Sequence, residues 1–156
     1  MPIPKKILNF LDKAKVKYKI LEHKKVFTAF DKSQTLKVLP KIVGKTVILN
    51  SGKELIFVLI PADKNLDLKK VKKKIGKEVK LARERKIQEK IKGVKLGAIP
   101  PFGNLWKAKT LVDSSFKKEK KIILNSGDWN FSIEISPKEF QKIVPDLVFG
   151  SFSKKK

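Results

Sequence analysis

Apolar residues recur with a helical period in several separate segments of the chain. Ile7, Leu8 and Leu11 fall on one face behind Pro4, which predicts a first helix over residues 4–15. Later segments begin at residues whose side chains favour a helix N-terminus, namely Thr28, Asp67 and Ser136. We therefore expect further helices at residues 28–36, 67–76, 83–92 and 136–144.

Shorter apolar runs between these segments predict strands. Residues 55–60 form an uninterrupted apolar run, which is typical of a strand buried on both faces or of a barrel strand. Other strands are expected at residues 16–20, 42–49, 79–81, 106–112, 122–124 and 131–135. Because helices and strands are mixed irregularly, we expect an α+β fold with a mixed sheet curled into a barrel-like core and surrounded by helices.

Length and composition favour a single domain. The chain has 156 residues, enough to bury a core without disulfides, and it contains no cysteine. We expect the domain to cover residues 1–150 and to be followed by a frayed basic tail at residues 151–156. The sequence shows neither a signal-peptide core nor an apolar run of membrane-spanning length, so we expect a cytoplasmic protein without a membrane partner.

Net charge points to a polyanionic partner. The chain carries 38 Lys and Arg residues against 15 Asp and Glu residues, for a formal net charge of +23. Such a field attracts polyanions and speeds their encounter, which makes RNA or DNA the natural partner. A lysine-biased proteome, in which lysine is the default surface residue, is an equally good explanation of the count.

The segment Gly97–Gly103 combines two glycines, two adjacent prolines and a phenylalanine. Proline fixes its own φ and restricts the residue before it, so we expect a stiff, exposed, non-helical loop. The backbone N–H groups of Gly97, Ala98 and Ile99 are then candidates to hold a carbonyl or phosphate oxygen without reorganisation. A purely structural turn between a helix and a strand has the same composition.

Lys45 lies inside an apolar strand segment, where lysine is uncommon. The run Gly44-Lys45-Thr46 is similar to part of a P-loop, but position 39 is leucine and no glycine-rich run precedes it, so we reject triphosphate binding. A half-buried lysine often has an altered pKa and marks a reactive site. The alternative is a strand-edge lysine whose amine reaches water.

His23 is the only histidine of the chain. A lone histidine after a strand is more often a surface or packing residue than a base. Because neither a second histidine nor any cysteine accompanies it, a zinc site or a Cys–His pair is not expected, and we predict no metal and no cofactor.

Several short segments stand in a characteristic order along nearly the whole chain. No single segment is specific, but their joint order resembles the YbaK/prolyl-tRNA synthetase-associated domain family, which includes YbaK, ProX and the editing insertion domain of bacterial prolyl-tRNA synthetase. The segments are Glu22-His23, Phe27-Thr28-Ala29, Val43-Gly44-Lys45-Thr46-Val47, Phe57 to Asp63 with Leu66-Asp67-Leu68, Lys80-Leu81-Ala82, Gly93 with Gly97 to Gly103, Val112-Asp113 and Ser136-Pro137.

The resemblance implies an editing activity. Free-standing members hydrolyse the ester of a mischarged aminoacyl-tRNA in trans, without a metal, on a barrel-like mixed sheet. It implies mischarged tRNA as the partner, tRNA-Pro or a related species, with an aminoacyl-tRNA synthetase as a further partner. The essential lysine of the family falls on Lys45 and its glycine-x-x-x-proline loop on Gly97 to Pro101. The catalytic residues expected here are therefore Lys45, Gly97, Ala98, Ile99 and Pro101.

Substrate contacts are expected from residues around these two elements. They are His23, Thr28, Phe30, Gly44, Thr46, Pro100, Phe102, Gly103 and Asp113. Some alanyl-tRNA deacylases of the ProX type carry a histidine near the strand that begins here at Phe131, whereas this chain has Asp128, Trp129 and Asn130, so the edited amino acid stays open. A non-catalytic RNA-binding protein and a regulatory binder of a free amino acid are the alternative functions.

Overall fold

Three of the five helices within residues 3–156 begin at a polar side chain that caps them, namely Thr28, Asp67 and Ser136. The structure, a computed structural model, describes residues 3–156. The Thr28 hydroxyl accepts the Asp31 N–H at 3.1 Å and the Ser136 hydroxyl accepts the Glu139 N–H at 3.1 Å. The helices are α1 (Lys5–Lys13), α2 (Ala29–Leu36), α3 (Leu68–Ile75), α4 (Glu84–Lys90) and α5 (Pro137–Ile143), which confirms the predicted set. No helix within residues 3–156 is long and apolar enough to cross a membrane.

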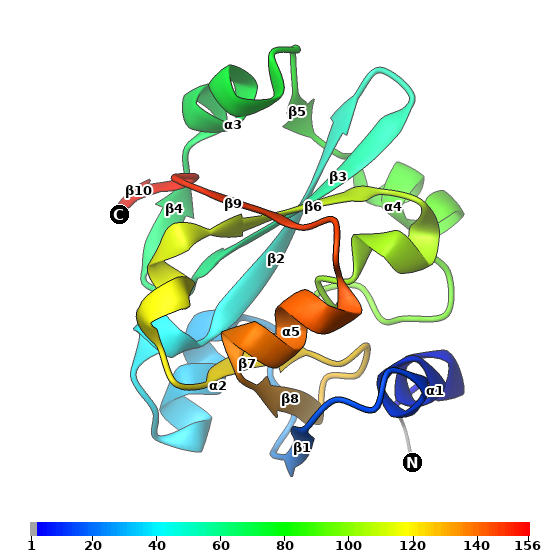
Figure 1. Cartoon of the computed structure of the whole chain (residues 1–156), viewed down its shortest axis with the longest axis vertical. Coiled ribbons are helices and arrows are strands. Elements are labelled where there is room, and N and C mark those ends of the chain that lie inside the picture. The colour runs from blue at the N-terminus through cyan, green and yellow to red at the C-terminus, as the bar shows by residue number, and fades with distance from the viewer. Residues whose placement is uncertain (1–2) are drawn as a thin grey trace.

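A five-stranded mixed sheet runs through the middle of the molecule (Figure 1). Its order is β5-β2-β3-β6-β9, with β2 and β3 antiparallel and β3, β6 and β9 parallel to one another. Residues 55–61 of β3 are all buried, as the apolar run predicts for a strand covered on both faces. The strands are β2 (Gly44–Ser51), β3 (Glu54–Pro61), β5 (Lys80–Leu81), β6 (Lys109–Asp113) and β9 (Val148–Gly150).

A second, three-stranded antiparallel sheet has the order β1-β8-β7. Its strands are β1 (Tyr18–Glu22), β7 (Ile122–Asn125) and β8 (Phe131–Ile135). A single parallel bridge between Val43 and Ile123 joins it to the segment that leads into β2. Both residues are buried in one apolar cluster, so the two sheets share a packed seam.

The expected barrel-like core is wrong. Within residues 3–156 the strands form separate sheets of five, three and two strands, and no ring of hydrogen bonds closes. The edge strands of the large sheet have only two and three residues, so they offer too few backbone groups to pair with one another. The α+β class is confirmed. The 3₁₀ helices are Pro40–Ile42, Gly103–Trp106 and Ser114–Lys118, and the second of these delays β6 relative to the predicted strand.

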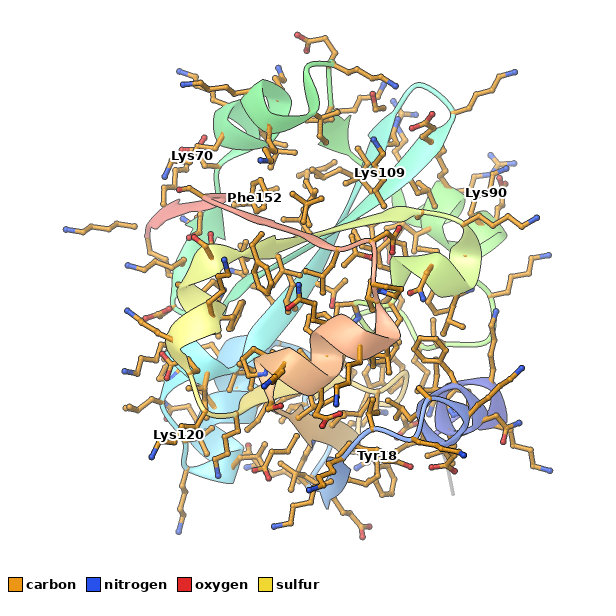
Figure 2. All side chains as sticks on the ribbon, in the orientation of Figure 1. Tyr18, Lys70, Lys90, Lys109, Lys120 and Phe152 are labelled. Carbon is orange, nitrogen blue, oxygen red and sulfur yellow. The ribbon has the colours of Figure 1, made fainter. Side chains whose placement is uncertain are left out.

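The expected frayed tail at residues 151–156 is also wrong. Residues Ser153–Lys155 form β10, which pairs antiparallel with β4 (Lys64–Leu66), and the two lie side by side in Figure 1. Phe152, labelled in Figure 2, is fully buried against the core cluster of β2, β3 and α3. Burial of this ring offsets the entropy of ordering a basic segment.

Asp113, expected to contact substrate, is instead a structural residue at the end of β6. Its Oδ1 accepts the Phe152 N–H at 2.9 Å and the Ser153 hydroxyl at 3.1 Å. Its Oδ2 accepts the N–H and the hydroxyl of Ser115 at 3.3 and 2.6 Å. Both carboxylate oxygens are therefore occupied in a buried position, and they fasten the C-terminal strand to the large sheet.

Replacing this carboxylate should destabilise the fold. Asp113→Ala leaves the Phe152 N–H and the Ser115 groups without their acceptor, so we expect the free energy of unfolding to fall by about 3 kcal/mol. Urea denaturation measures the loss, with Asp146→Ala at an exposed position as the matched control. Equal stability of the two variants would show that the buried carboxylate does not hold the C-terminal strand.

Candidate functional site

A cavity of about 510 Å³ lies between the start of α2, the start of β2 and the loop at Gly97. Lys45 and Gly97, which belong to segments more than fifty residues apart in the sequence, line this one cavity. Gly97 is therefore the residue of the glycine-proline loop that lies in the same cavity as Lys45. The lining residues are Phe27, Thr28, Ala29, Phe30, Lys45, Thr46, Ala62, Gly97, Asn125 and Lys156.

Lys45 is a partly buried lysine near the beginning of β2, opposite Ile60 of β3. Burial is the main cause that lowers the pKa of its amine, the Lys156 charge lowers the pKa further, and Asp63 opposes both. Within residues 3–156 no carboxylate lies within 4.0 Å of the Lys45 amine. The site therefore presents a cation that is poorly solvated and ready for an anionic or strongly polar ligand.

Thr46 adds an unpaired hydroxyl to the cavity wall. Its Oγ1 is buried and has no hydrogen-bond partner within the part of the chain that the structure describes. The Oδ1 of Asp63, the carboxylate that acts on Lys45, is buried in the same way. An unpaired buried polar atom costs about 1–3 kcal/mol, so such atoms beside a cavity are candidates to pair with a ligand.

The loop at residues 97–103 is non-helical up to Phe102, as predicted, but it is not exposed. Gly97 alone is exposed, and residues 98–103 are buried. Phe102 packs between the rings of Phe10 and Phe140, with centroid distances of 5.2 and 6.1 Å. The apolar side chains of the loop therefore anchor it in the core, and its N-terminal end alone reaches the cavity.

The three amides expected as donors differ in availability. The Ala98 N–H donates to the Lys95 carbonyl at 3.0 Å, so it is already occupied. The N–H groups of Gly97 and Ile99 make no hydrogen bond within residues 3–156. Gly97 also lines the cavity, with φ at +84°, whereas Ile99 joins the core cluster around Phe57. The Gly97 N–H is therefore the best placed donor of the three.

Pro101, expected to be catalytic, and several expected contact residues lie in packed positions outside the cavity. Phe102 and the two prolines of the loop, Pro100 and Pro101, are buried and do not line the cavity. A Cβ on Gly44 would lie 2.6 Å from Leu59 Cδ1, and a Cβ on Gly103 would lie 2.6 Å from Thr110 Oγ1. These glycines permit close packing of the backbone, which is why side chains are missing at these positions.

His23 lies outside the cavity and is held on both ring nitrogens. Its Nδ1 is 2.8 Å from the Lys24 carbonyl oxygen and its Nε2 is 2.9 Å from the Ser132 hydroxyl. Burial is the main cause that lowers the pKa of the ring. His23 therefore orders the end of β1.

Of the expected contact residues, Thr28, Phe30 and Thr46 do line the cavity.

Lys32 is the site residue that sequence reasoning missed. Its side chain is buried with 5% relative exposure, and its Nζ donates to Asn125 Oδ1 at 2.7 Å. The Asn125 Nδ2 in turn donates to the Ile99 carbonyl at 3.2 Å. Burial lowers the pKa of Lys32 to about 7. Its position three residues after Ala29 and four before Leu36, on the apolar face of α2, was the available signal.

The acidic and histidine side chains do not gather into a metal site. Within residues 3–156 no group of three or more His, Cys, Asp or Glu side chains is arranged to hold an ion. The polar groups that line the cavity are amine, hydroxyl, amide and backbone groups. The arrangement is therefore suited to hold and polarise a carbonyl or phosphate oxygen by hydrogen bonds and charge.

The sequence matches a known family over most of its length. The aminoacyl-tRNA editing domain family matches residues 23–143, a range that includes Lys45 and Gly97. The prolyl-tRNA editing protein ProX of Acetoanaerobium sticklandii is 28% identical over 145 residues, which cover 88% of each chain. The proline–tRNA ligase of Aquifex aeolicus is 33% identical over 121 residues, which are 74% of this chain and 21% of the ligase.

Solved structures show the same fold. The crystal structure of a hypothetical protein superposes with a TM-score of 0.86 at 25% identity, covering 96% of this chain and 99% of that one. A structure described as a candidate trans-editing enzyme for prolyl-tRNA synthetase superposes with a TM-score of 0.87 at 17% identity. The match covers 99% of this chain and 98% of that one. At that identity the second likeness concerns the fold alone.

Lys32 should make stability depend on pH. Its pKa is about 7 in the folded protein but about 10.4 in the unfolded chain, so the unfolded state binds more protons between these values. The free energy of unfolding should therefore rise with pH across this range, by at most about 1.4 kcal/mol per pH unit from this group.

Lys32→Met isolates this contribution. We expect the variant to be more stable than the original protein near pH 7, and the difference to shrink as the pH rises toward 10. Urea denaturation at several pH values measures it. Lys69→Met, at an exposed position on α3, is the matched control for exchanging one lysine for methionine. A constant difference for Lys32→Met would show that this amine stays protonated in the fold.

Proposed function

Because this chain belongs to the aminoacyl-tRNA editing domain family, we propose that it is a free-standing deacylase that hydrolyses the ester of a mischarged tRNA in trans. The observation that carries the proposal is that Lys45, Thr46 and Gly97 line one cavity. We propose tRNA-Pro or a related species as the substrate, because a relative that this chain matches over 88% of both chains is a prolyl-tRNA editing protein.

Hydrolysis of an aminoacyl ester needs few catalytic groups, because this ester is already activated. A water molecule, positioned by the neighbouring ribose hydroxyl of the substrate, attacks the ester carbonyl and gives up a proton. The resulting tetrahedral oxyanion collapses, the bond to the ribose oxygen breaks, and that oxygen takes up a proton. We assign the oxyanion to the Gly97 N–H, since a fixed donor at this position is worth about 3 kcal/mol in comparable acyl-transfer sites.

Lys45 acts as an ammonium in this proposal. Its charge holds the ester carbonyl or the terminal ribose hydroxyl, and its partial burial strengthens that interaction, because a less solvated charge is less screened. Thr46 supplies a hydroxyl with free hydrogen-bonding capacity. The occupied Ala98 amide takes no part in the step; it keeps the loop in place.

The main rival is an RNA-binding protein that uses the same basic surface without hydrolysis. Figure 2 shows amine-bearing side chains around the outline of the molecule, with Lys70, Lys90 and Lys120 labelled at the periphery. This distribution supports salt-sensitive binding of RNA under either function. Incubation with tRNA-Pro charged with proline, alanine or cysteine separates them, since only the deacylase releases the amino acid from one of these esters.

Removing the Lys45 amine should abolish hydrolysis without removing the tRNA. For Lys45→Ala we expect ester turnover to fall by at least about a hundredfold, because the charge that holds the reacting end is lost. The affinity for uncharged tRNA should change little, since many other lysines contact phosphate. Lys19→Ala, an exposed lysine on β1, is the matched control. Unchanged turnover in Lys45→Ala would refute the assigned role.

A further inference from the structure

Three aromatic side chains form a rim beside the Lys45 cavity. Phe27 and Phe30 are 57% and 44% exposed, which is unusual for large apolar side chains in a chain with a well-filled core. The rings of Phe27 and Trp129 pack edge to face, with centroids 5.1 Å apart. We call Phe27, Phe30 and Trp129 the aromatic rim.

Lysine amines lie over the rings of this rim. The Lys25 Nζ is 4.6 Å from the Trp129 centroid and 5.4 Å from that of Phe27. The Lys95 Nζ lies 5.1 Å from the Trp129 centroid, and the Lys156 Nζ lies 5.2 Å from that of Phe30. The rim therefore offers flat apolar faces and positive charge at the same place.

The Phe27–Trp129 pair is held in position rather than loosely attached. The Trp129 Nε1 donates to the Leu96 carbonyl at 2.8 Å, and the Val26 N–H donates to the Trp129 carbonyl at 3.3 Å. A Cβ on Gly97 would lie 3.7 Å from Trp129 Nε1 and 3.7 Å from the Phe27 carbonyl oxygen. The rim is thus fixed directly against the glycine that lines the cavity.

Phe27 and Phe30 each line two hollows. One is the Lys45 cavity, and the other is a hollow of about 420 Å³ that Lys24 and Lys25 also line. A ligand whose end enters the cavity would therefore lead out across the aromatic rim and past these lysines.

We infer that the aromatic rim is a stacking site for an unpaired nucleobase next to the acylated end of an RNA strand, with Lys25 and Lys156 contacting its phosphates. Aromatic rings stack on any base, and nearby amines neutralise the backbone, which is the combination that single-stranded nucleic acids require. The inference rests on the proposed function only for the identity of the RNA end.

Trp129 provides a direct probe. The chain has two tryptophans, and Trp106→Phe leaves Trp129 as the only one. In this background, we titrate the protein with a short single-stranded RNA that ends in a 3′-hydroxyl and carries no amino acid. A base that stacks on the rim should quench the fluorescence of Trp129.

Variants of the rim test the contacts. Phe27→Ala should weaken binding of the RNA about tenfold, because stacking on one ring is lost. Phe149→Ala is the matched control, since Phe149 is also a partly exposed ring under a lysine, with the Lys117 Nζ 4.9 Å from its centroid, but it lies on β9. The control should bind the RNA within about twofold of the original protein.

Three results would overturn the inference. They are an unquenched Trp129, equal binding of an abasic strand of the same length, and equal quenching by an acidic peptide, which would favour a protein partner for the rim. The test contains no ester, so loss of hydrolysis in another variant does not affect it. Conversely, a protein that hydrolyses mischarged tRNA but fails this titration would retain the proposed function and lose the stacking site.

Discussion

A chain of hydrogen bonds through a buried lysine sets the shape of the site. Lys32 connects α2 to Asn125 at the end of β7, and Asn125 connects to the Ile99 carbonyl in the loop at residues 97–103. Lys32 and Asn125 together therefore connect three elements that line the cavity or adjoin it. Burying an amine that has no carboxylate partner within residues 3–156 lowers the stability of the fold. The hydrogen bond from Lys32 to Asn125 in return fixes the position of α2 relative to β7.

Local patterns in the sequence were sufficient for much of the fold. Capping residues such as Thr28 and Ser136 and the apolar run of β3 act over a few residues, so their consequences can be derived without the tertiary structure. Local patterns could not show whether the sheet closes into a barrel, because closure depends on whether short edge strands such as β5 pair with a strand far away in the sequence.

The site residues likewise divide into those that the sequence predicted and those that it did not. Lys45 stood out because lysine is unusual in an apolar strand, and Gly97 because glycine and proline define a loop. Lys32 and the occupied carboxylate of Asp113 did not stand out, since their roles depend on Asn125 and Phe152, which come from distant segments. The composition of the loop at residues 97–103 is compatible with an exposed turn and also with a buried segment. In the structure, residues 98–103 are buried.

The cavity is built from two kinds of element, a strand that carries Lys45 and the first turn of a short helix that carries Ala29 and Phe30. Under the proposed function, substitutions in that turn reshape the space for an acyl side chain while β2 keeps Lys45 in position. If the proposed hydrolysis takes place here, selectivity and reactivity are separable in this scaffold, because changes in α2 alter which amino acid fits without moving Lys45 or Gly97.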